Sequence, residues 1–270
     1  MRFTKMHGLG NDYLYVFGEV PDNASELSIK LSERHFGAGS DGMIWISKSD
    51  IADFKMRIFN ADGSEAKMCG NGIRCVGKYV YDKGYTDQTH LTIETLSGMR
   101  ELLLTVESDK VQTVSVNMGT AICEAPLPLT VGDRSMVCMP VSVGNPHAVF
   151  FTQNVAAVPL PELGPKIEHH HAFQDGVNVE FVQVINSSEL RMRVWERGSG
   201  VTMACGTGAC ASASAMAAIA GGFCSYHTPI VVHLDGGDLT IQVAENKSIT
   251  MTGPAEFVYE GETEICLHRT

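Results

Sequence analysis

Apolar and polar residues alternate along several short segments of the chain, a pattern typical of strands with one buried face. The pattern is clearest in DFKMRIFN at residues 53–60 and in ELRMRVWE at residues 189–196. LTIETL at 91–96 and IVVHLDGGDLTIQV at 230–243 predict further strands. Hairpin turns are predicted at the glycines beside or within these segments, at Ser97-Gly98 and Gly236-Gly237.

The two clearest strands open an internal repeat. FNADGSEAKMCGNG at residues 59–72 aligns with WERGSGVTMACGTG at residues 195–208, at the offset of the strands themselves. Cys69 therefore falls on Cys205, and each begins a Cys-Gly-x-Gly. Several matches in one order at nearly constant offset indicate two homologous α/β halves related by an approximate two-fold axis. Two similar hairpins without common ancestry are the alternative. The match extends outward to Gly10-Asn11 and Gly144-Asn145.

In each half the strand leads through a Gly-rich turn into a predicted helix. The first helix is expected from about Cys69 to near Gly84, and the second from about Cys205 to Gly221-Gly222, because glycine commonly ends helices. Alanine and serine dominate the second helix, and such small side chains let strands approach closely. We therefore expect it to be a buried central element. The Pro-containing stretch from Glu124 to Leu129 lies between the halves and is a candidate boundary.

Composition limits the class of protein. The chain has 270 residues, of which 44% are hydrophobic and 19% charged, as in an ordinary globular protein of one large or two medium domains. Its formal net charge of -11 disfavours nucleic acid and anionic membranes as partners. The first residues lack the apolar core of a signal peptide, and no apolar run of about 18 residues predicts a membrane span.

The eight cysteines include no CxxC pair, which disfavours a zinc site or a thioredoxin-like motif. A chain of this size without a secretion signal indicates free thiols in the cytoplasm. The run His169-His170-His171 resembles a metal cluster, but adjacent histidines converge poorly on one ion, so we expect an exposed loop. The remaining thiols are expected to be structural, with two on the helices facing the core, Cys75 and Cys210, and four without a motif, Cys123, Cys138, Cys224 and Cys266.

Cys69 and Cys205 differ from the other thiols because each stands where a helix begins. Backbone N–H groups there lack partners and the helix dipole is positive, so we expect a lowered pKa for both thiols. The adjacent glycines let a carboxylate approach those N–H groups closely. Two such helix starts brought to one cleft would place an amino-acid α-carbon between two sulfurs. One thiolate would remove the α-proton and the opposite thiol would return one, which inverts the configuration.

No motif for pyridoxal phosphate, a nucleotide or a metal is evident, so the residues favour a cofactor-independent epimerase acting on a small amino acid. The sequence also resembles the diaminopimelate epimerase family over essentially its whole length. The segments that carry the resemblance are MHGLGNDY at 6–13, RHFGAGSDG at 34–42, FNADGSEAKMCGNGIRC at 59–75, GNPH at 144–147, GVNVEF at 176–181 and WERGSGVTMACGTGA at 195–209.

The resemblance implies conversion of LL-2,6-diaminopimelate to the meso form, on the route to lysine and peptidoglycan. It implies an α/β (α+β) fold of two pseudo-symmetric domains, each a mixed or antiparallel sheet around a central helix. We expect them at residues 1–116 and 117–255, with a C-terminal strand from about 256 to 270 returning to the first. The resemblance also implies a homodimer without a cofactor or metal.

The site residues follow from the matched motifs. Cys69 and Cys205 would be the acid–base pair, and no contact is assigned to Gly42. The reacting carboxylate would bind the helix-start N–H groups of Gly70, Asn71, Gly206 and Thr207. The distal end of the substrate would be held by polar side chains that suit its ammonium and carboxylate groups, Asn11, Asn60, Asn145, Asn178, Glu196 and Arg197.

Alternatives stay open. A racemase of another amino acid, such as proline or histidine, could use the same scaffold, although Glu196 and Arg197 favour a substrate with a second charged end. A thiol-redox or ligand-binding protein could use the two cysteines as a reversible disulfide. Asn60 and Asn145 could instead cap turns. Three further residues are as well explained by structural or surface roles, His147, Asp62 and Glu65.

Overall fold

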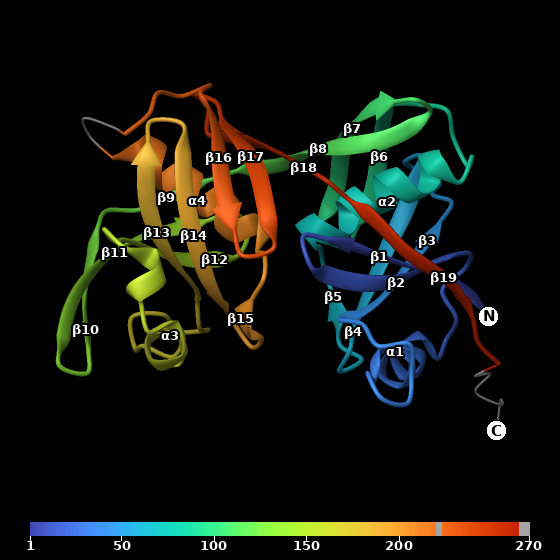
Figure 1. Ribbon diagram of the computed structural model, residues 1–270, viewed down its shortest axis with the longest axis horizontal. Coiled ribbons are helices and arrows are strands. Elements are labelled where there is room, and N and C mark those ends of the chain that lie inside the picture. Colours follow the sequence, from blue (N-terminus) through green and yellow to red (C-terminus); the bar gives the residue numbers. More distant parts are fainter. Residues whose placement is uncertain (220–222, 265–270) are drawn as a thin grey trace. The chain divides into compact units, whose positions relative to one another are not determined.

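The computed structural model describes residues 1–219 and 223–264, which divide into two compact units (Figure 1). Unit 1 comprises Met1–Val116 and the chain from Gly253 onward, and unit 2 comprises Asn117–Thr252. The candidate boundary stretch Glu124–Leu129 lies inside unit 2, shortly after the change of unit at Asn117. Its prolines do not prevent the chain from pairing there as an edge hairpin.

Unit 1 combines a mixed sheet with two helices. Its strands run antiparallel in the pairs β1–β2, β3–β4 and β6–β7, and parallel in β2–β3 and β4–β6. The bounds are β1 Arg2–Gly8, β2 Asn11–Phe17, α1 Ala24–Ser32, β3 Gly42–Ser47, β4 Phe54–Asn60, β5 Glu65–Ala66, α2 Gly70–Asp82, β6 His90–Thr95, β7 Gly98–Glu107 and β19 Glu256–Glu262. The strand β8, Lys110–Thr120, begins in unit 1 and ends in unit 2.

Unit 2 repeats this pairing scheme. β12–β13 is parallel and β13–β14 antiparallel, β14–β16 is parallel and β16–β17 antiparallel. The bounds are β9 Ile122–Cys123, β10 Leu127–Val131, β11 Arg134–Ser142, β12 Pro146–Phe151, a 3-10 turn Val155–Ala157, α3 Leu160–Glu168, β13 Asn178–Asn186, β14 Glu189–Glu196, β15 Gly200–Thr202, α4 Gly206–Ala218, β16 Pro229–Leu234, β17 Gly237–Val243 and β18 Ser248–Gly253.

The two units therefore share one order of elements. α1 connects parallel strands β2 and β3 as α3 connects β12 and β13, and α2 and α4 occupy matching places before β6 and β16. The predicted α/β class, with a mixed sheet and a central helix in each half, is confirmed. β19, which follows unit 2 in the chain, pairs antiparallel with β1 of unit 1. The end of the predicted returning strand, 265–270, lies outside the described residues.

The helices α2 and α4 lie against their own sheets (Figure 1). α2 packs on β1, β2 and β7, whereas α4 packs on strands from β9 to β17. α2 ends at Asp82, and Gly84 takes a positive φ of 75° just beyond it, as expected of a glycine that ends a helix. α4 is buried along nearly its whole length, as its Ala and Ser content predicts. Its predicted end at Gly221-Gly222 lies outside the described residues.

Both predicted hairpins are confirmed. Thr95 pairs with Gly98 and Leu234 pairs with Gly237, so each turn has a two-residue loop. The core prediction for the helix cysteines is also correct, since Cys75 and Cys210 are fully buried. Of the four motif-free thiols, Cys138 is buried and two are half-buried, Cys123 and Cys224, while Cys266 lies outside the described residues.

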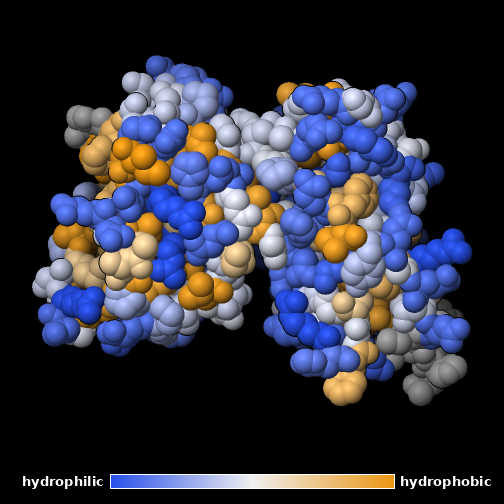
Figure 2. Space-filling model, viewed as in Figure 1, coloured by the Kyte–Doolittle hydropathy of each residue, from blue (hydrophilic) through white to orange (hydrophobic). Residues whose placement is uncertain are grey.

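The surface is mainly hydrophilic on the face seen in Figure 2, where apolar residues form small separate groups. His169 and His171 are exposed just after α3, as predicted for a loop. Asp62 and Glu65 also lie at the surface, Asp62 bonded to Ser64 and Glu65 paired with Arg57. Within residues 1–219 and 223–264, the helices are all too short or too polar to span a bilayer.

Helix α3 depends on a glycine for its contact with β14. A Cβ at Gly164 would stand 2.5 Å from the Trp195 ring, which cannot move freely because its indole N–H donates to Glu168 at 2.6 Å. Gly164→Ala should therefore lower the free energy of unfolding by about 1–3 kcal/mol, measured by urea denaturation. Lys166→Ala on the exposed face of α3, which removes only a surface ion pair with Glu162, is the control. Equal stability of the two variants would contradict this packing.

Candidate active site

Cys69 stands at the N-cap of α2, directly after the turn that follows β5. Its backbone is extended, with φ −137° and ψ 116°, so the helix begins at the next residue. The sulfur accepts a hydrogen bond from the Gly72 N–H at 3.3 Å, and the thiol donates to Oδ1 of Asn11 at 3.4 Å. The sulfur therefore has one donor suited to a thiolate and one acceptor suited to a thiol.

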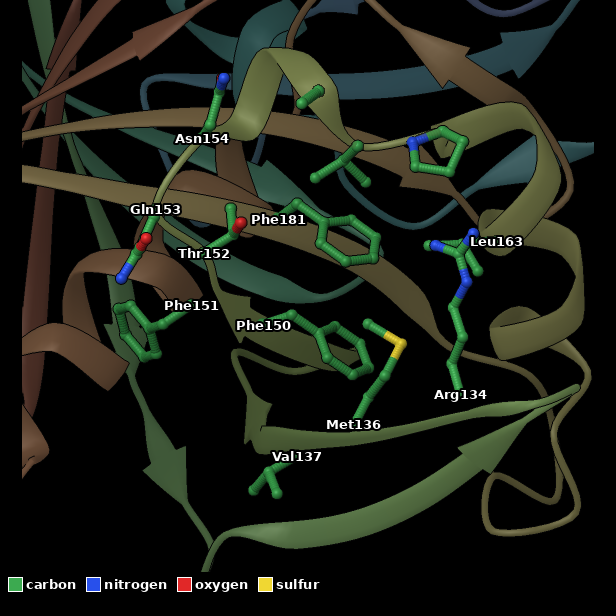
Figure 3. Close-up of a pocket in the computed structure, with 13 residues that line it drawn as sticks. Arg134, Met136, Val137, Phe150, Phe151, Thr152, Gln153, Asn154, Leu163 and Phe181 are labelled. Atoms are coloured by element: carbon green, nitrogen blue, oxygen red, sulfur yellow. The ribbon is translucent and has the colours of Figure 1, made fainter.

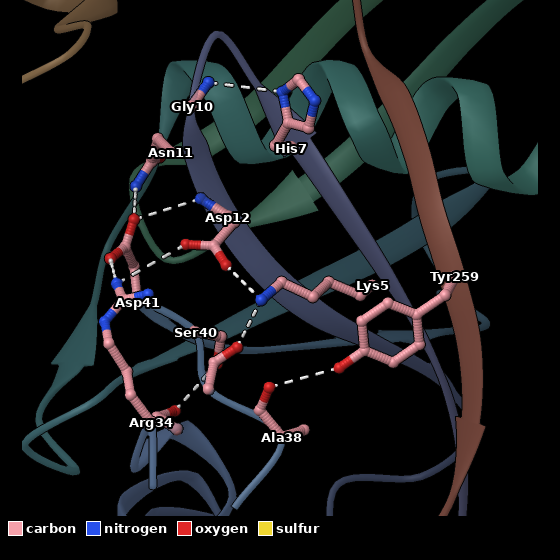
Figure 4. Close-up of polar contacts among 12 residues, drawn as sticks. Lys5, His7, Gly10, Asn11, Asp12, Arg34, Ala38, Ser40, Asp41 and Tyr259 are labelled. Carbon is pink, nitrogen blue, oxygen red and sulfur yellow. Dashed lines mark hydrogen bonds and ion pairs between the residues drawn. The ribbon is translucent and has the colours of Figure 1, made fainter.

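The Asn11 side chain joins Cys69 to the start of β2. Its Oδ1 also accepts from the amide of Asn71 at 3.5 Å, and its Nδ2 donates to Asp41 at 2.8 Å (Figure 4). Asn71 is 4% exposed and lies in the first turn of α2 with Gly70. The N–H groups of a first turn have no acceptor within their own helix, so a helix start is suited to binding an anion. Unit 1 thus brings together four of its five predicted site residues.

Asn60 is the exception in unit 1. Its amide donates to the Ser64 hydroxyl at 3.0 Å, and its backbone N–H donates to the Ser64 carbonyl at 2.8 Å. These bonds close the turn between β4 and β5. The turn-capping alternative therefore describes what Asn60 does within unit 1.

Cys205 occupies the matching N-cap of α4, with φ −121° and ψ 110°, and only 4% of the residue is exposed. Its sulfur lies 3.5 Å from the hydroxyl of Thr207. The expected lowering of the thiol pKa is wrong here. Burial raises the pKa of Cys205 well above its ordinary value, and the carboxylates of Glu196 and Glu180 raise it further. Hydrogen bonding to Thr207 and Gly208 at the helix start opposes these effects but is weaker.

A buried polar chain extends from Thr207 into the sheet. Nδ2 of Asn145 donates to the Thr207 hydroxyl at 3.3 Å, and Oδ1 of Asn145 lies 3.0 Å from Nε2 of His147. Nδ1 of His147 lies 2.7 Å from Oε1 of Glu180, and both side chains are fully buried. These contacts place His147 in a buried polar chain that leads to Thr207 at the start of α4, a position that the sequence left undecided.

Glu180, at the end of this buried polar chain, packs closely against the first turn of α4. A Cβ at Gly208 would stand 2.7 Å from Oε1 of Glu180. Only glycine leaves room here for the buried carboxylate beside the first turn of the helix, where the helix dipole favours a negative charge.

Glu196 and Arg197 end β14 and enter the turn before β15. Burial raises the pKa of Glu196, and hydrogen bonds from Thr202 and Cys205 only partly offset this. Asn178 is buried and fixes this turn, since its Oδ1 accepts from the Arg197 N–H at 3.0 Å and its Nδ2 donates to the Pro146 carbonyl at 3.0 Å. The Arg197 guanidinium donates to the Asp175 carbonyl. Unit 2 therefore clusters its predicted residues around the start of α4.

Two contributors to the site were missed from the sequence, Glu180 and Asp41. Glu180 is the one charged residue in the apolar stretch VNVEFV, and a lone charge on a buried strand is a usable signal. Asp41 follows a Gly-rich loop, where an acidic residue carries no such signal.

The cavity of about 520 Å³ in unit 2 is a separate feature (Figure 3). Phe150, Leu163 and Phe181 from the core of unit 2 line it together with Met136 and other residues of the β11 edge. None of the predicted site residues borders it. Within the described residues, His, Cys, Asp and Glu side chains form no cluster of three or more suited to a metal ion.

The fold is shared with a group of racemases and related proteins. A PhzF-family phenazine biosynthesis protein from Bacillus anthracis matches 98% of this chain with 99% of its own, at TM-score 0.76 and 17% identity. A probable proline racemase from Agrobacterium radiobacter matches 99% of this chain with 94% of its own, at TM-score 0.73 and 16% identity. These similarities define the class of fold.

The sequence comparisons identify one family within this class of fold. The profile of the diaminopimelate epimerase family matches residues 3–123 and 139–258. Diaminopimelate epimerase of Acetivibrio thermocellus is 50% identical over 281 residues, covering 98% of this chain and 99% of the relative, and that of Bacteroides thetaiotaomicron is 51% identical over 269 residues, covering 98% of both. The chain belongs to the diaminopimelate epimerase family.

The electrostatics of Cys205 lead to a direct prediction. Because Glu196 contributes a negative charge beside the thiol, Glu196→Gln should lower the pKa of Cys205. The pH midpoint of alkylation at Cys205 by a small neutral reagent, followed by mass spectrometry, should fall. Glu189→Gln makes the same change at the opposite end of β14 and should leave the midpoint in place. An unchanged midpoint in Glu196→Gln would contradict the role assigned to this carboxylate.

Proposed function

We propose that the protein interconverts LL- and meso-2,6-diaminopimelate by moving a proton between two thiols, without a cofactor. One observation carries the proposal. In a chain of the diaminopimelate epimerase family, both cysteines of the internal repeat are N-caps of the corresponding helices α2 and α4. The family supports epimerisation, and the paired N-caps support the use of Cys69 and Cys205 as the acid–base pair.

The reacting carboxylate would be held by first-turn N–H groups of both helices, those of Gly70 and Asn71 and those of Gly206 and Thr207. Removal of the α-proton moves negative charge onto this carboxylate, so donors already aimed at it stabilise the transition state more than the ground state. One such donor is commonly worth about 3–4 kcal/mol. Several donors in a site from which water is excluded can therefore offset the weak acidity of the α-carbon.

Proton transfer would use the sulfurs in opposite protonation states. In one direction the Cys69 thiolate, stabilised by the Gly72 N–H, removes the α-proton while the Cys205 thiol donates to the opposite face. In the reverse direction Cys205 is the base and the Cys69 thiol is the acid. The high pKa of Cys205 makes it a thiol at rest. A substrate ammonium beside Glu196 would neutralise a charge that raises this pKa, so substrate binding would ease formation of the Cys205 thiolate.

The distal end of the substrate would bind polar groups on both units. Glu196 suits an ammonium, and Arg197 suits a carboxylate, which a guanidinium can bind through two parallel hydrogen bonds. Asn178 holds the backbone of Arg197 and so sets where that side chain starts. The asparagine amides, which can donate or accept, complete the proposed set with Asn11, Asn60 and Asn145.

We further propose that the protein works in the cytoplasm as a homodimer, on the route to lysine and peptidoglycan precursors, and binds no nucleic acid. The acidic composition supports the lack of a nucleic-acid partner. The family resemblance supports the dimer, which sedimentation equilibrium tests directly.

Replacement of either thiol provides the mutational test. Cys69→Ala and Cys205→Ala should each reduce turnover of LL-diaminopimelate to background, because either variant lacks the acid or the base needed in each direction. Turnover is followed by chromatographic separation of the LL and meso isomers. Cys75→Ala removes a buried thiol on α2 away from the N-cap and should retain activity if it folds.

The alternatives give other outcomes. Normal turnover in either N-cap variant would exclude the two-thiol mechanism. Inversion of proline or histidine in place of diaminopimelate would favour the racemase alternative. Full activity after the two thiols are oxidised to a disulfide would favour the redox class, since neither sulfur could then carry a proton.

A further inference from the structure

Asp41, the residue before β3, lies behind the Asn11–Cys69 contact. One oxygen of its carboxylate, Oδ2, accepts from Nδ2 of Asn11 at 2.8 Å and from the backbone N–H of Asp12 at 3.1 Å (Figure 4). The other oxygen, Oδ1, faces the guanidinium of Arg34 at 3.3 Å. The carboxylate is therefore held at both oxygens, by groups from β2 and from the turn after α1.

Asp41 decides which end of the Asn11 amide faces the thiol. A carboxylate accepts hydrogen bonds and donates none, so the amide must turn its NH₂ toward Asp41. Its oxygen then points the other way, where it accepts from the Cys69 thiol at 3.4 Å and from the Asn71 amide at 3.5 Å. A flipped amide would set its oxygen against the Asp41 carboxylate, which pairs two acceptors, and its NH₂ against the Asn71 NH₂, which pairs two donors.

The backbone around Asp41 fixes its position. Its N–H donates to the Asp12 carbonyl at 2.8 Å, and its carbonyl accepts from the Ala61 N–H at 2.9 Å. The next residue, Gly42, lies so close to β4 that a Cβ there would stand 2.2 Å from the Phe59 carbonyl oxygen. The carboxylate thus projects from a backbone that is tied on both sides, and the amide of Asn11 adjusts to it.

The charge on Asp41 is balanced locally. Arg34 lies near both Asp41 and Asp12, and Lys5 pairs with Asp12 at 2.7 Å and donates to the Gly39 carbonyl at 2.6 Å (Figure 4). Partial burial raises the pKa of Asp41, whereas the bonds from Asn11 and Asp12 lower it. Asp12 makes its own contacts in this group without touching the Asn11 amide, which makes it a matched comparison.

We propose that Asp41 is a positioning residue that acts on the Cys69 proton transfer through Asn11. By holding the NH₂ of the amide, it keeps an oxygen beside the Cys69 thiol and so favours the protonated sulfur. The Gly72 N–H, on the helix side, favours the thiolate. Cys69 can then serve as acid and as base without any rearrangement of its neighbours. The catalytic part of this inference rests on the proposed role of Cys69, but the orientation of the amide does not.

The test measures Cys69 itself, without substrate. In Asp41→Ala, the amide can turn or withdraw, and either change removes an acceptor that favours the thiol. Alkylation of Cys69 near neutral pH, followed by peptide mass spectrometry, should become about five-fold faster, the factor expected for one ordinary hydrogen bond. Cys205, on unit 2, should react at its wild-type rate and serves as the internal reference.

Three variants separate positioning from structure. Asp41→Asn keeps an oxygen that can accept from Asn11 and should react like the wild type. Asp12→Asn makes the same chemical change at the neighbouring carboxylate, which pairs with Lys5. It should lower the melting temperature while leaving Cys69 alkylation unchanged. The double variant Asn11→Ala with Asp41→Ala should react no faster than Asn11→Ala alone, because Asp41 acts through that amide.

Turnover provides the second measurement. Asp41→Ala should lower kcat by about 10²-fold, as a misplaced reacting group does, with a smaller change in KM, and Asp41→Asn should restore most of it. If Asp41→Ala does not fold, Asp41→Ser replaces it, since its hydroxyl is one bond shorter than the carboxylate and withdraws the acceptor from the Asn11 amide.

Unchanged Cys69 alkylation in a folded Asp41→Ala or Asp41→Ser variant would overturn the proposal, as would additive effects of Asp41 and Asn11. Faster alkylation of Cys69 and Cys205 together would also overturn it, because that result indicates general loosening. If only the proposed function were wrong, Cys69 alkylation would still change as predicted in these variants. The effect of Asp41 on turnover of LL-diaminopimelate would then be absent.

Discussion

The structure depends on one constraint, a cysteine held at the N-cap of a central helix. The helix start supplies backbone N–H donors that have no acceptor within the helix, and the Cys69 sulfur accepts from one of them, the Gly72 N–H. Glycine is required beside it, because Gly208 leaves space for the buried Glu180. The strands that pack on the helix then bring asparagine and acidic side chains to the sulfur.

The two N-caps occupy different electrostatic surroundings although they belong to one repeat. Cys69 is half-buried and bonds Asn11 and the Gly72 N–H. Burial raises the pKa of Cys205, and two nearby carboxylates raise it further. A reversible epimerase needs both sulfurs to gain and lose a proton, but nothing requires them to start equal. The raised pKa of Cys205 favours its protonated form in the absence of substrate.

Much of the fold could be predicted because the repeat is strong. The alternation in 53–60 and 189–196 fixed β4 and β14, and Gly98 and Gly237 marked hairpins correctly. The raised pKa of Cys205 could not be predicted, because a helix start lowers a thiol pKa whereas burial beside Glu180 raises it, and only packing decides between them. The contributions of Asp41 and His147 could not be predicted either, because they depend on contacts with residues that are distant in the sequence.

The central claim is that two groups, rather than one, carry the proton. Enzyme turned over with LL-diaminopimelate in D₂O tests this most directly, with mass spectrometry of both isomers after less than one equilibration. Two thiols predict meso product that contains deuterium at the inverted carbon, while the remaining LL substrate keeps its hydrogen. Product that retains hydrogen, or LL substrate that gains deuterium as fast as product forms, would show a single group serving both faces and would contradict the account.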